Sequence, residues 1–525
     1  MLDFTIPTEQ TVLLAFLKRR HPEYLKLITH WLFMQGTYEG GREWFNANIF
    51  KYLKEGPDEY KDRIARAYRF NHTRETVDLI QKYIFKGNIA RNWDDAPDYI
   101  QKFWDNATLS GLDIEQFMRL ISTQSSVSGR VWVFVDSNKS QTVRSVQDEK
   151  DAGVRVYAYT VKIQDILDVG LNDTGEPQWV LVRESVRDDE DPIFSTGEVK
   201  DRFRLWTRNS WALFSIETNT QSGKIEERVD LLDAGEHNLG VVPGFPHDHV
   251  IGEHRYSAPA LINDIAYLDR AVANYLSNLD AIIQDQTFSQ LAIPAQSISA
   301  TDDTKKTILE MGTKRIFTYD GEGNGKPEFI SPDPRQAQLI IEVVNKIINE
   351  IYHTIGLAGE RTKEDNAVGI DNSSGVAKAY DFERVNSLLA AKADSLENTE
   401  NKLVDLIGRW NSVEAAEPSE LVKYPQTFDV RSLFDEFSVA ERLALIEAPD
   451  ETRRQQMRQV IDKLFPDIAK SLKEKMISEL EQWPKDPIEQ AAALAAATAP
   501  PTSFDNSKKN PQTQNRQGQV TSSTE

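Results

Sequence analysis

Apolar residues recur at helical spacing in three long stretches of the chain, residues 257–288, 334–355 and 375–410. The stripe in the first stretch consists of Leu261, Ile265, Leu268, Val272, Leu276, Leu279 and Ile283. Steps of three or four residues predict helices that bury at least one face. At 1.5 Å per residue, the first helix would be a rod of roughly 45 Å. Ser257 is predicted to cap its N-terminus, because a serine oxygen there can accept a free backbone N–H.

The second stretch has well-marked ends. Asp333 as N-cap and Pro334 at the first helical position predict its start, with Gln336 completing a capping box. Gly356 predicts its end. Its apolar residues are Leu339, Ile340, Ile341, Val343, Val344, Ile347, Ile348 and Ile351. Because they cover more than one face, we expect the helix to be buried on several sides, in part by neighbouring subunits.

The third stretch is long for a globular helix. A stripe at intervals of seven consists of Leu389, Leu396, Leu403 and Trp410. A helix of about 36 residues with such a stripe must either kink or span a large body.

The rest of the chain changes period several times. Residues 1–127 show helical spacing, with Asp113 and Gln116 as a capping box. Residues 128–256 are rich in Val, Tyr, Trp and Phe that alternate with polar positions, which predicts strands, with a hairpin turn at 208–210. The expected class is therefore α+β and mainly helical.

Three further segments complete the layout. Residues 290–333 contain KRIFTY and EFIS on either side of GEGNGKP, which predicts a hairpin. Further helices are predicted over residues 437–483. Residues 484–525 are rich in Ala, Gln, Asn, Ser and Thr, which predicts a mostly disordered tail.

A polar segment of about 18 residues joins the second and third helices, over residues 356–375. Loops of that length in compact proteins are usually functional or disordered. A functional loop and a floppy surface connection both fit this segment.

Composition narrows the possible functions. The chain has 525 residues and a net charge of -21, which argues against a broad basic surface that grips nucleic acid but allows a protein that surrounds DNA. The absence of cysteine excludes disulfides and thiolate chemistry. Asp3 stands where the basic start of a signal peptide belongs, and no apolar run reaches the ~18 residues of a membrane span.

No motif predicts catalysis. GEGNGKP fails as a phosphate loop, because Pro327 follows Lys326 where Ser or Thr would bind magnesium. His247, His249 and His254 could in principle bind a metal, but exposed turn histidines are the favoured interpretation. GxSxG and HExxH are absent. We expect no catalytic residue, cofactor or metal.

Four stretches carry a resemblance to a known family: YRFNHTRETVDLIQKYIFKG, NLGVVPGFPH, SAPALINDIAYLDRAVANYLSNLDAIIQDQTFSQL and NSSGVAKAYDFERVNSLLAAKADSLENTENKLVDL. Over roughly residues 20–445 the chain resembles the portal proteins of tailed double-stranded DNA phages. The resemblance implies a ring, typically a dodecamer, at one capsid vertex, with no membrane partner. It also implies assembly in the host cytoplasm and a final location in the virion.

The resemblance also implies a division of the chain. The wing would be residues 1–256, the stem 257–289 and 334–355, the clip 290–333, the tunnel loop 356–375, the long wing helix with its linker 376–436 and the crown 437–483. The tunnel-loop residues expected to face double-stranded DNA are Arg361, Lys363, Glu364, Asp365, Asn366, Asp371 and Asn372. The clip residues expected to bind partners are Lys305, Lys306, Lys314, Arg315, Asp320 and Lys326.

The implied partners are further copies of the chain, the terminase, a head-tail adaptor, and the major capsid and scaffolding proteins. The alternative is another helical virion component, such as a head-tail adaptor or a minor capsid protein, although adaptors are usually smaller. An enzyme with an unrecognised site is a more distant third.

Overall fold

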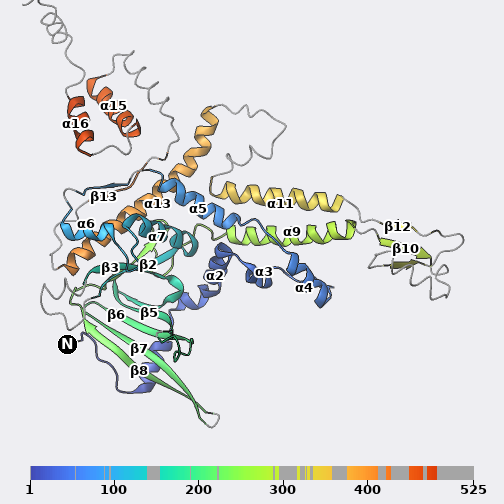
Figure 1. The fold of residues 1–525 in the computed structure, drawn as a ribbon, viewed down its shortest axis with the longest axis horizontal. Coiled ribbons are helices and arrows are strands. Elements are labelled where there is room, and N and C mark those ends of the chain that lie inside the picture. The colour runs from blue at the N-terminus through green and yellow to red at the C-terminus, as the bar shows by residue number, and fades with distance from the viewer. Residues whose placement is uncertain are drawn as a thin grey trace, which may run out of the picture. The chain divides into compact units, whose positions relative to one another are not determined.

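The structure is a computed structural model that describes residues 2–138, 154–294, 316–356, 375–411, 421–428 and 449–481. Within these ranges it leaves out residues 54, 88, 94–95, 190, 222–223, 288–289, 320–325, 327, 331–334, 427 and 465–469. The chain divides into two compact units, Met1–Asp429 and Val430–Glu525. Helices and sheets are both well represented in the larger unit, as expected of an α+β protein (Figure 1).

Helices form the first part of the larger unit. They are α1 (Gln10–Lys18), α2 (Pro22–Glu39), α3 (Arg42–Asn48), α4 (Pro57–Arg66), α5 (His72–Ile84), α6 (Asp98–Asp105) and α7 (Ile114–Ser128). The capping box predicted at the start of α7 is confirmed. The backbone N–H of Gln116 donates to the Asp113 carboxylate, and the backbone N–H of Asp113 donates to the side-chain oxygen of Gln116.

Strands follow, as the change of period predicts. They are β2 (Arg130–Ser137), β3 (Val156–Lys162), β4 (Ile166–Leu171), β5 (Pro177–Arg187), β6 (Val199–Thr207), β7 (Ser210–Gln221), β8 (Lys224–Glu236) and β9 (Gly244–Asp248), with the short helix η1 (Ile163–Asp165) before β4. One antiparallel sheet has the order β4-β5-β6-β7-β8 and another has the order β3-β2-β9. The hairpin turn predicted at residues 208–210 joins β6 to β7.

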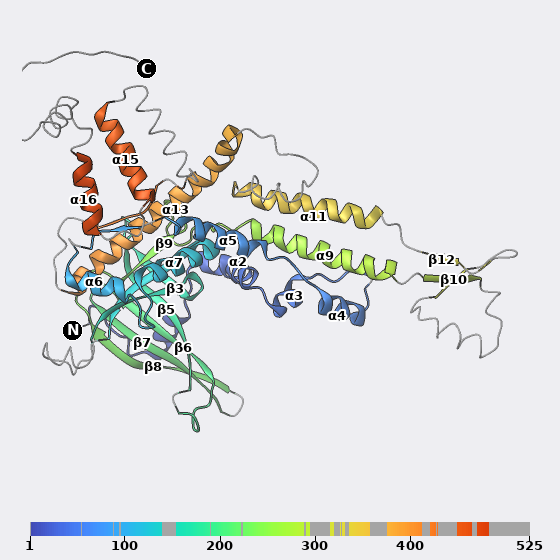
Figure 2. The same cartoon turned by 45° about the horizontal axis from the view of Figure 1, so that its top comes forward.

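Two long helices, α9 (Ile265–Thr287) and α11 (Arg335–Thr354), run side by side in opposite directions (Figures 1 and 2). The first helix begins at Ile265 rather than at Ser257, so the predicted cap is wrong. The Ser257 hydroxyl donates to the Glu23 carboxylate instead. Pro259 and its neighbour Ala258 lie against Gly129, whose φ of +81° and lack of a side chain permit that approach.

A small sheet connects the two helices along the chain. It contains β10 (Gln290–Pro294), β11 (Ile316–Tyr319) and β12 (Glu328–Ile330). The predicted hairpin of β11 with β12 is wrong, because β10 lies between them, parallel to β11 and antiparallel to β12. The capping residues Asp333 and Pro334 fall outside the described part of the chain.

The third long helix, α13 (Gly375–Trp410), has the predicted boundaries. Leu389, Leu396 and Leu403 are completely buried. The helix contacts α5, α6, α7, β2 and β9 and therefore spans the larger unit. Beside it, β1 (Ala90–Arg91) pairs with β13 (Val422–Lys423). The smaller unit contains α15 (Asp450–Leu464) and α16 (Lys470–Glu481).

Candidate functional site

The residues predicted to face DNA all lie outside the described part of the chain, as do five of the six clip residues. Those five are Lys305, Lys306, Lys314, Arg315 and Asp320. Lys326 alone is described, and its side chain is exposed. These assignments remain predictions. The structure does describe the helices on either side of both segments.

One face of α9 packs against α11. Val272 and Leu276 of α9 form a buried cluster with Val344 of α11. Ile340, Ile347 and Ile348 pack at the edge of this cluster. These positions recur at helical spacing on both helices, which explains why two helices far apart in the sequence pair along their length.

The opposite face of α9 packs against α3 and α4. Ala273 shares a buried cluster with Trp44 and Ile49. The Asn274 side chain donates to the Asn48 carbonyl over 2.9 Å and accepts the Phe50 amide over 3.0 Å. Positions 272 and 274 differ by about 200° around a helix. α9 is therefore held between two layers.

An ion pair fixes the segment between α3 and α4. Arg63 and Glu55 are both almost fully buried, and Arg63 donates to both Glu55 oxygens over 2.7 and 2.8 Å. Arg63 also donates to Ser277 Oγ of α9 over 2.9 Å. Hydrogen bonds from Arg63 lower the pKa of the Glu55 carboxyl. This network ties α4 to the side of α9 that α11 does not cover.

The polar segment after α11 starts from a fixed point. Gly356 has a φ of +78° and ends the helix as predicted. A side chain at Gly356 would meet Arg384 and Val385 of α13 at 3.2–3.3 Å. The Tyr352 hydroxyl donates to Glu75 over 2.6 Å, which ties the end of α11 to α5. The predicted loop therefore begins where α5, α11 and α13 meet.

Two of the three histidines lie in the protein interior. The prediction of exposed turn histidines is wrong for His247 and His249, which are buried, and right for His254. Strand β9 pairs with β2; His247 lies on β9 and His249 directly follows it, and their side chains contact residues of α7 and α13. His247 Nδ1 lies 2.7 Å from Thr399 Oγ1, and its Nε2 lies 3.1 Å from Ser125 Oγ.

Lys392 of α13 is fully buried in the same layer. Its Nζ donates to the Ser122 carbonyl over 3.0 Å and to Ser126 Oγ over 2.6 Å, and lies 2.8 Å from His249 Nδ1. Burial lowers the pKa of the Lys392 amine well below its usual range. Burial, with Lys392 nearby, likewise lowers the pKa of both His247 and His249.

Sequence reasoning missed this cluster although a signal was present. Lys392 and Thr399 are three residues after Leu389 and Leu396, so they lie on the same face of the helix as the leucine stripe. Polar residues at such positions indicate buried hydrogen bonds.

An amine beside a serine hydroxyl can act as a base in some hydrolases. Here both Ser126 and Lys392 are sealed from solvent, so no substrate reaches them. Within the described residues, no group of three or more histidine or acidic side chains is placed to hold a metal ion. None of the described helices combines the length and apolar character that a membrane crossing needs.

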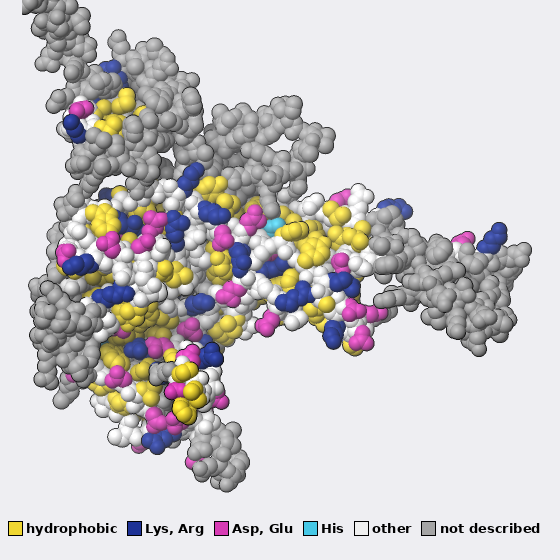
Figure 3. Space-filling model, viewed as in Figure 1, with side chains coloured by type: hydrophobic (Ala, Val, Ile, Leu, Met, Phe, Trp, Pro, Cys, Tyr) yellow, Lys and Arg dark blue, Asp and Glu magenta, His cyan; other side chains and the backbone are white. Residues whose placement is uncertain are grey.

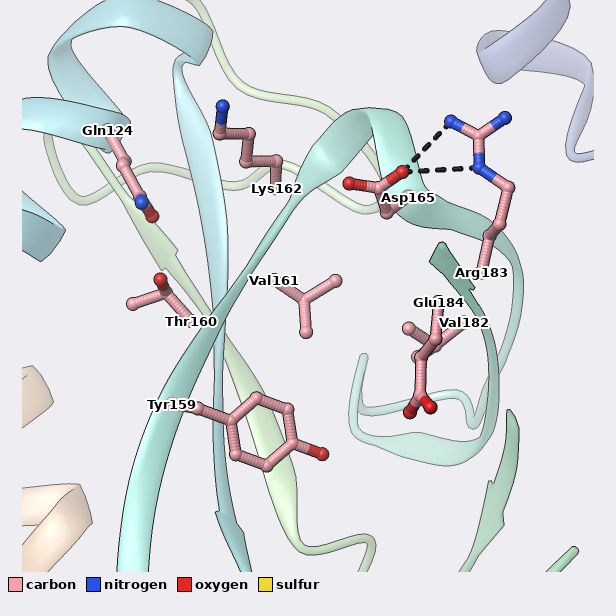
Figure 4. A pocket seen from close by; sticks show the side chains of 9 residues that line it. All are labelled: Gln124, Tyr159, Thr160, Val161, Lys162, Asp165, Val182, Arg183 and Glu184. Atoms are coloured by element: carbon pink, nitrogen blue, oxygen red, sulfur yellow. Dashed lines mark hydrogen bonds and ion pairs between the residues drawn. The ribbon is translucent and has the colours of Figure 1, made fainter. Parts of the chain in front are cut away.

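A cavity of about 440 Å³ lies between α7, β3 and β5 (Figure 4). Arg183 on its wall donates to Asp165 over 2.9 Å, so the cation is already paired. The lining side chains include neither histidine nor serine. The other polar groups of the lining include Thr160, Lys162 and Glu184.

Two solved structures show a distant likeness to this chain, whereas two other comparisons find nothing. A scan against models of protein families and a search of curated proteins give no match. Among solved structures, a chain from the neck of an empty gene transfer agent particle overlaps with a TM-score of 0.36 and 9% identity, covering 72% of this chain and 90% of that one. A chain from the virion of a native gene transfer agent particle overlaps with a TM-score of 0.38 and 10% sequence identity, covering 79% of this chain and 98% of that one. Neither overlap is close enough to assign a fold or a function.

Proposed function

We propose that the chain is a portal protein, whose copies form a ring at one vertex of a phage capsid and let double-stranded DNA pass during packaging and ejection. The observation that supports this most is the arrangement around α9. A rod held between two layers leads to a small sheet, returns as α11, and continues through a polar segment into the 36-residue helix α13. The portal resemblance implies this order.

The surface of α11 supports an assembly of several copies. Leu339 and Ile341 are 61% and 46% exposed, although α11 is a long, ordered helix. Hydrophobic side chains are visible over the helix pair in Figure 3. Burying each such side chain against a neighbouring copy would contribute about 1–2 kcal/mol.

The charge of the chain fits a conduit. A net charge of -21 repels phosphates, so a ring of such chains would let a duplex slide. We propose that Arg361 and Lys363, repeated around the ring, make brief phosphate contacts without reading sequence. We also propose that the segment between α9 and α11 binds the terminase and later the head-tail adaptor, and that the chain has no catalytic activity of its own.

Native mass spectrometry of the full chain, combined with negative-stain images, tests the ring. We expect a closed assembly, typically of twelve copies, with a central channel. A monomer or dimer at micromolar concentration would contradict the proposal. Turnover of ATP by the purified chain would contradict the absence of catalysis.

The DNA contact has its own test. The double variant Arg361→Gln and Lys363→Gln should assemble normally but package DNA more slowly in vitro. The matched control is Lys102→Gln with Arg228→Gln, two exposed cations on α6 and β8. Equal packaging rates in the two double variants would contradict the proposed contact between Arg361, Lys363 and DNA.

A further inference from the structure

The contact of α13 with α7 and β9 includes a polar cluster that has no counter-ion. Lys392 Nζ makes its three hydrogen bonds to Ser122 and Ser126 of α7 and to His249, which follows β9. None of these partners carries a negative charge. A buried cation without a carboxylate is expensive, whereas a neutral amine in the same place is not.

The nearby carboxylates are already occupied. Both oxygens of Asp248 accept hydrogen bonds from Arg130, over 2.5 and 2.8 Å. Both oxygens of Glu400 accept hydrogen bonds from Arg91, over 2.6 and 3.1 Å. The other buried polar groups of these elements are uncharged or basic: Ser122, Ser125, Ser126 and Ser128 on α7, His247 on β9, and Ser395 and Thr399 on α13. The acids Glu115, Asp394 and Glu397 accept hydrogen bonds from Arg119, Gln426 and Tyr424. Within the described residues, Lys392 therefore has hydrogen bonds to neutral groups only.

The hydrogen-bond geometry fits the uncharged pair. A neutral amine has two N–H donors, which match the Ser122 carbonyl and Ser126 Oγ, and one lone pair, which matches an N–H on His249 Nδ1. Within the described residues, His249 Nε2 is buried and has no hydrogen-bond partner. If that nitrogen or the amine takes up a proton, the pair becomes a buried cation. Exposure of the pair to water is then favoured.

We propose that Lys392 and His249 form a proton-sensitive latch, which holds α13 against α7 and β9 while the pair is uncharged and releases the helix when the pair takes up a proton. The latch lies within one chain and does not depend on the proposed ring. Because the segment before Gly375 leads directly into α13, release would loosen the downstream anchor of that segment.

Hydrogen exchange of the full chain, measured between pH 8 and pH 5.5 and corrected for the intrinsic rates, tests the latch. The opening constant of amides at 385–403 should rise by about tenfold per pH unit for each proton taken up. Amides of β5 and β6 provide an internal reference that should not follow this rise. An opening constant of α13 that stays flat over this range overturns the proposal.

Three variants separate the latch from a general loss of packing. Lys392→Met removes the amine and should reduce the pH dependence of α13, most clearly between pH 8 and about pH 6.5, where free histidine is also mostly neutral. Lys392→Arg keeps a permanent charge, so α13 should open readily at every pH if this variant folds. Arg409→Met, an exposed cation on the same helix, should behave like the parent. A pH dependence in Lys392→Met equal to that of the parent overturns the proposal, even where Lys392→Arg fails to fold.

Discussion

α11 leads into the segment 357–374 and α13 leads out of it, yet the two helices are buried in different ways. α13 buries its whole leucine stripe within its own chain and adds paired polar groups, such as Glu400 with Arg91. α11 buries one side against α9 and leaves Leu339 and Ile341 in solvent. The difference indicates that α13 is completed by the fold, whereas α11 has surface left for a partner. Four measurements test this contrast.

The largest effect is expected at the ion pair that fixes α13 beside β1. Arg91→Met would leave Glu400 fully buried and without its cation, which should lower the free energy of unfolding by about 3–5 kcal/mol. Arg119→Met is the matched control, because its pair with Glu115 is half exposed and should contribute less than about 1 kcal/mol. Chemical denaturation of both variants gives the comparison. Equal losses would mean that the Arg91 pair does not anchor the helix.

Leucine truncations compare the two helices directly. Leu396→Ala in α13 should lower the free energy of unfolding by about 2–5 kcal/mol, because it opens a cavity in a packed core. Leu339→Ala in α11 should change the value for the isolated chain by less than about 0.5 kcal/mol, because the side chain is exposed. Denaturation at concentrations below any assembly checks both. A large loss for Leu339→Ala would show that α11 is already covered.

The buried histidines predict a pH dependence of unfolding. Burial lowers the folded-state pKa of His247 and His249, so below about pH 6.5 the unfolded chain binds more protons than the folded chain. The two histidines therefore leave the free energy of unfolding unchanged above about pH 6.5. Below that pH they lower it by about 1.4 kcal/mol per pH unit for each histidine. Denaturation at pH 7.5 and pH 5.5 should show this loss.

The variant His247→Asn provides the control for that measurement, since the shorter amide can take the place of Nδ1 beside Thr399 but does not titrate. The loss on acidification should be smaller than the parent's by about 1.4 kcal/mol, which is the share of one histidine between pH 6.5 and pH 5.5. An unchanged loss would assign the pH dependence to groups other than His247.

The smallest effect is expected at the exposed apolar residues of α11, Leu339 and Ile341. Leu339→Asp should leave unfolding of the single chain almost unchanged but raise the concentration needed for assembly by roughly tenfold. The control is Ile193→Asp, which also replaces an exposed aliphatic side chain by a carboxylate, at a position between β5 and β6. Sedimentation over a range of concentrations measures the shift. Equal shifts would mean that α11 has no special part in assembly.

The sequence predicts local features well. The boundaries of α13 follow from a stripe at intervals of seven, and the start of α7 follows from Asp113 and Gln116. Both signals act within a few turns of one helix, and the contacts of the folded chain are compatible with them. The end of α11 at Gly356 belongs to the same group, because a residue with positive φ stops a helix locally.

The wrong predictions all depended on distant partners. Ser257 does not cap α9 because the helix begins only at Ile265, and the Ser257 hydroxyl donates to Glu23, far away in the sequence. β11 does not pair with β12 because β10 lies between them. His247 on β9 and His249 just after it are buried because Thr399 and Lys392 of α13 pack against them. The proposed DNA and partner contacts stay predictions, since the residues concerned lie outside the described ranges.

The position of α9 has a mechanical consequence. Its two faces are shared with α11 on one side and with α3 and α4 on the other, and Arg63 ties the second side to Ser277. A force applied to one layer therefore reaches the other through a stiff rod rather than through a pliable loop. Because the three layers are joined side by side, we expect them to resist bending together. A force applied at the small sheet of β10, β11 and β12 would then be transmitted along α9 and α11 to the rest of the larger unit.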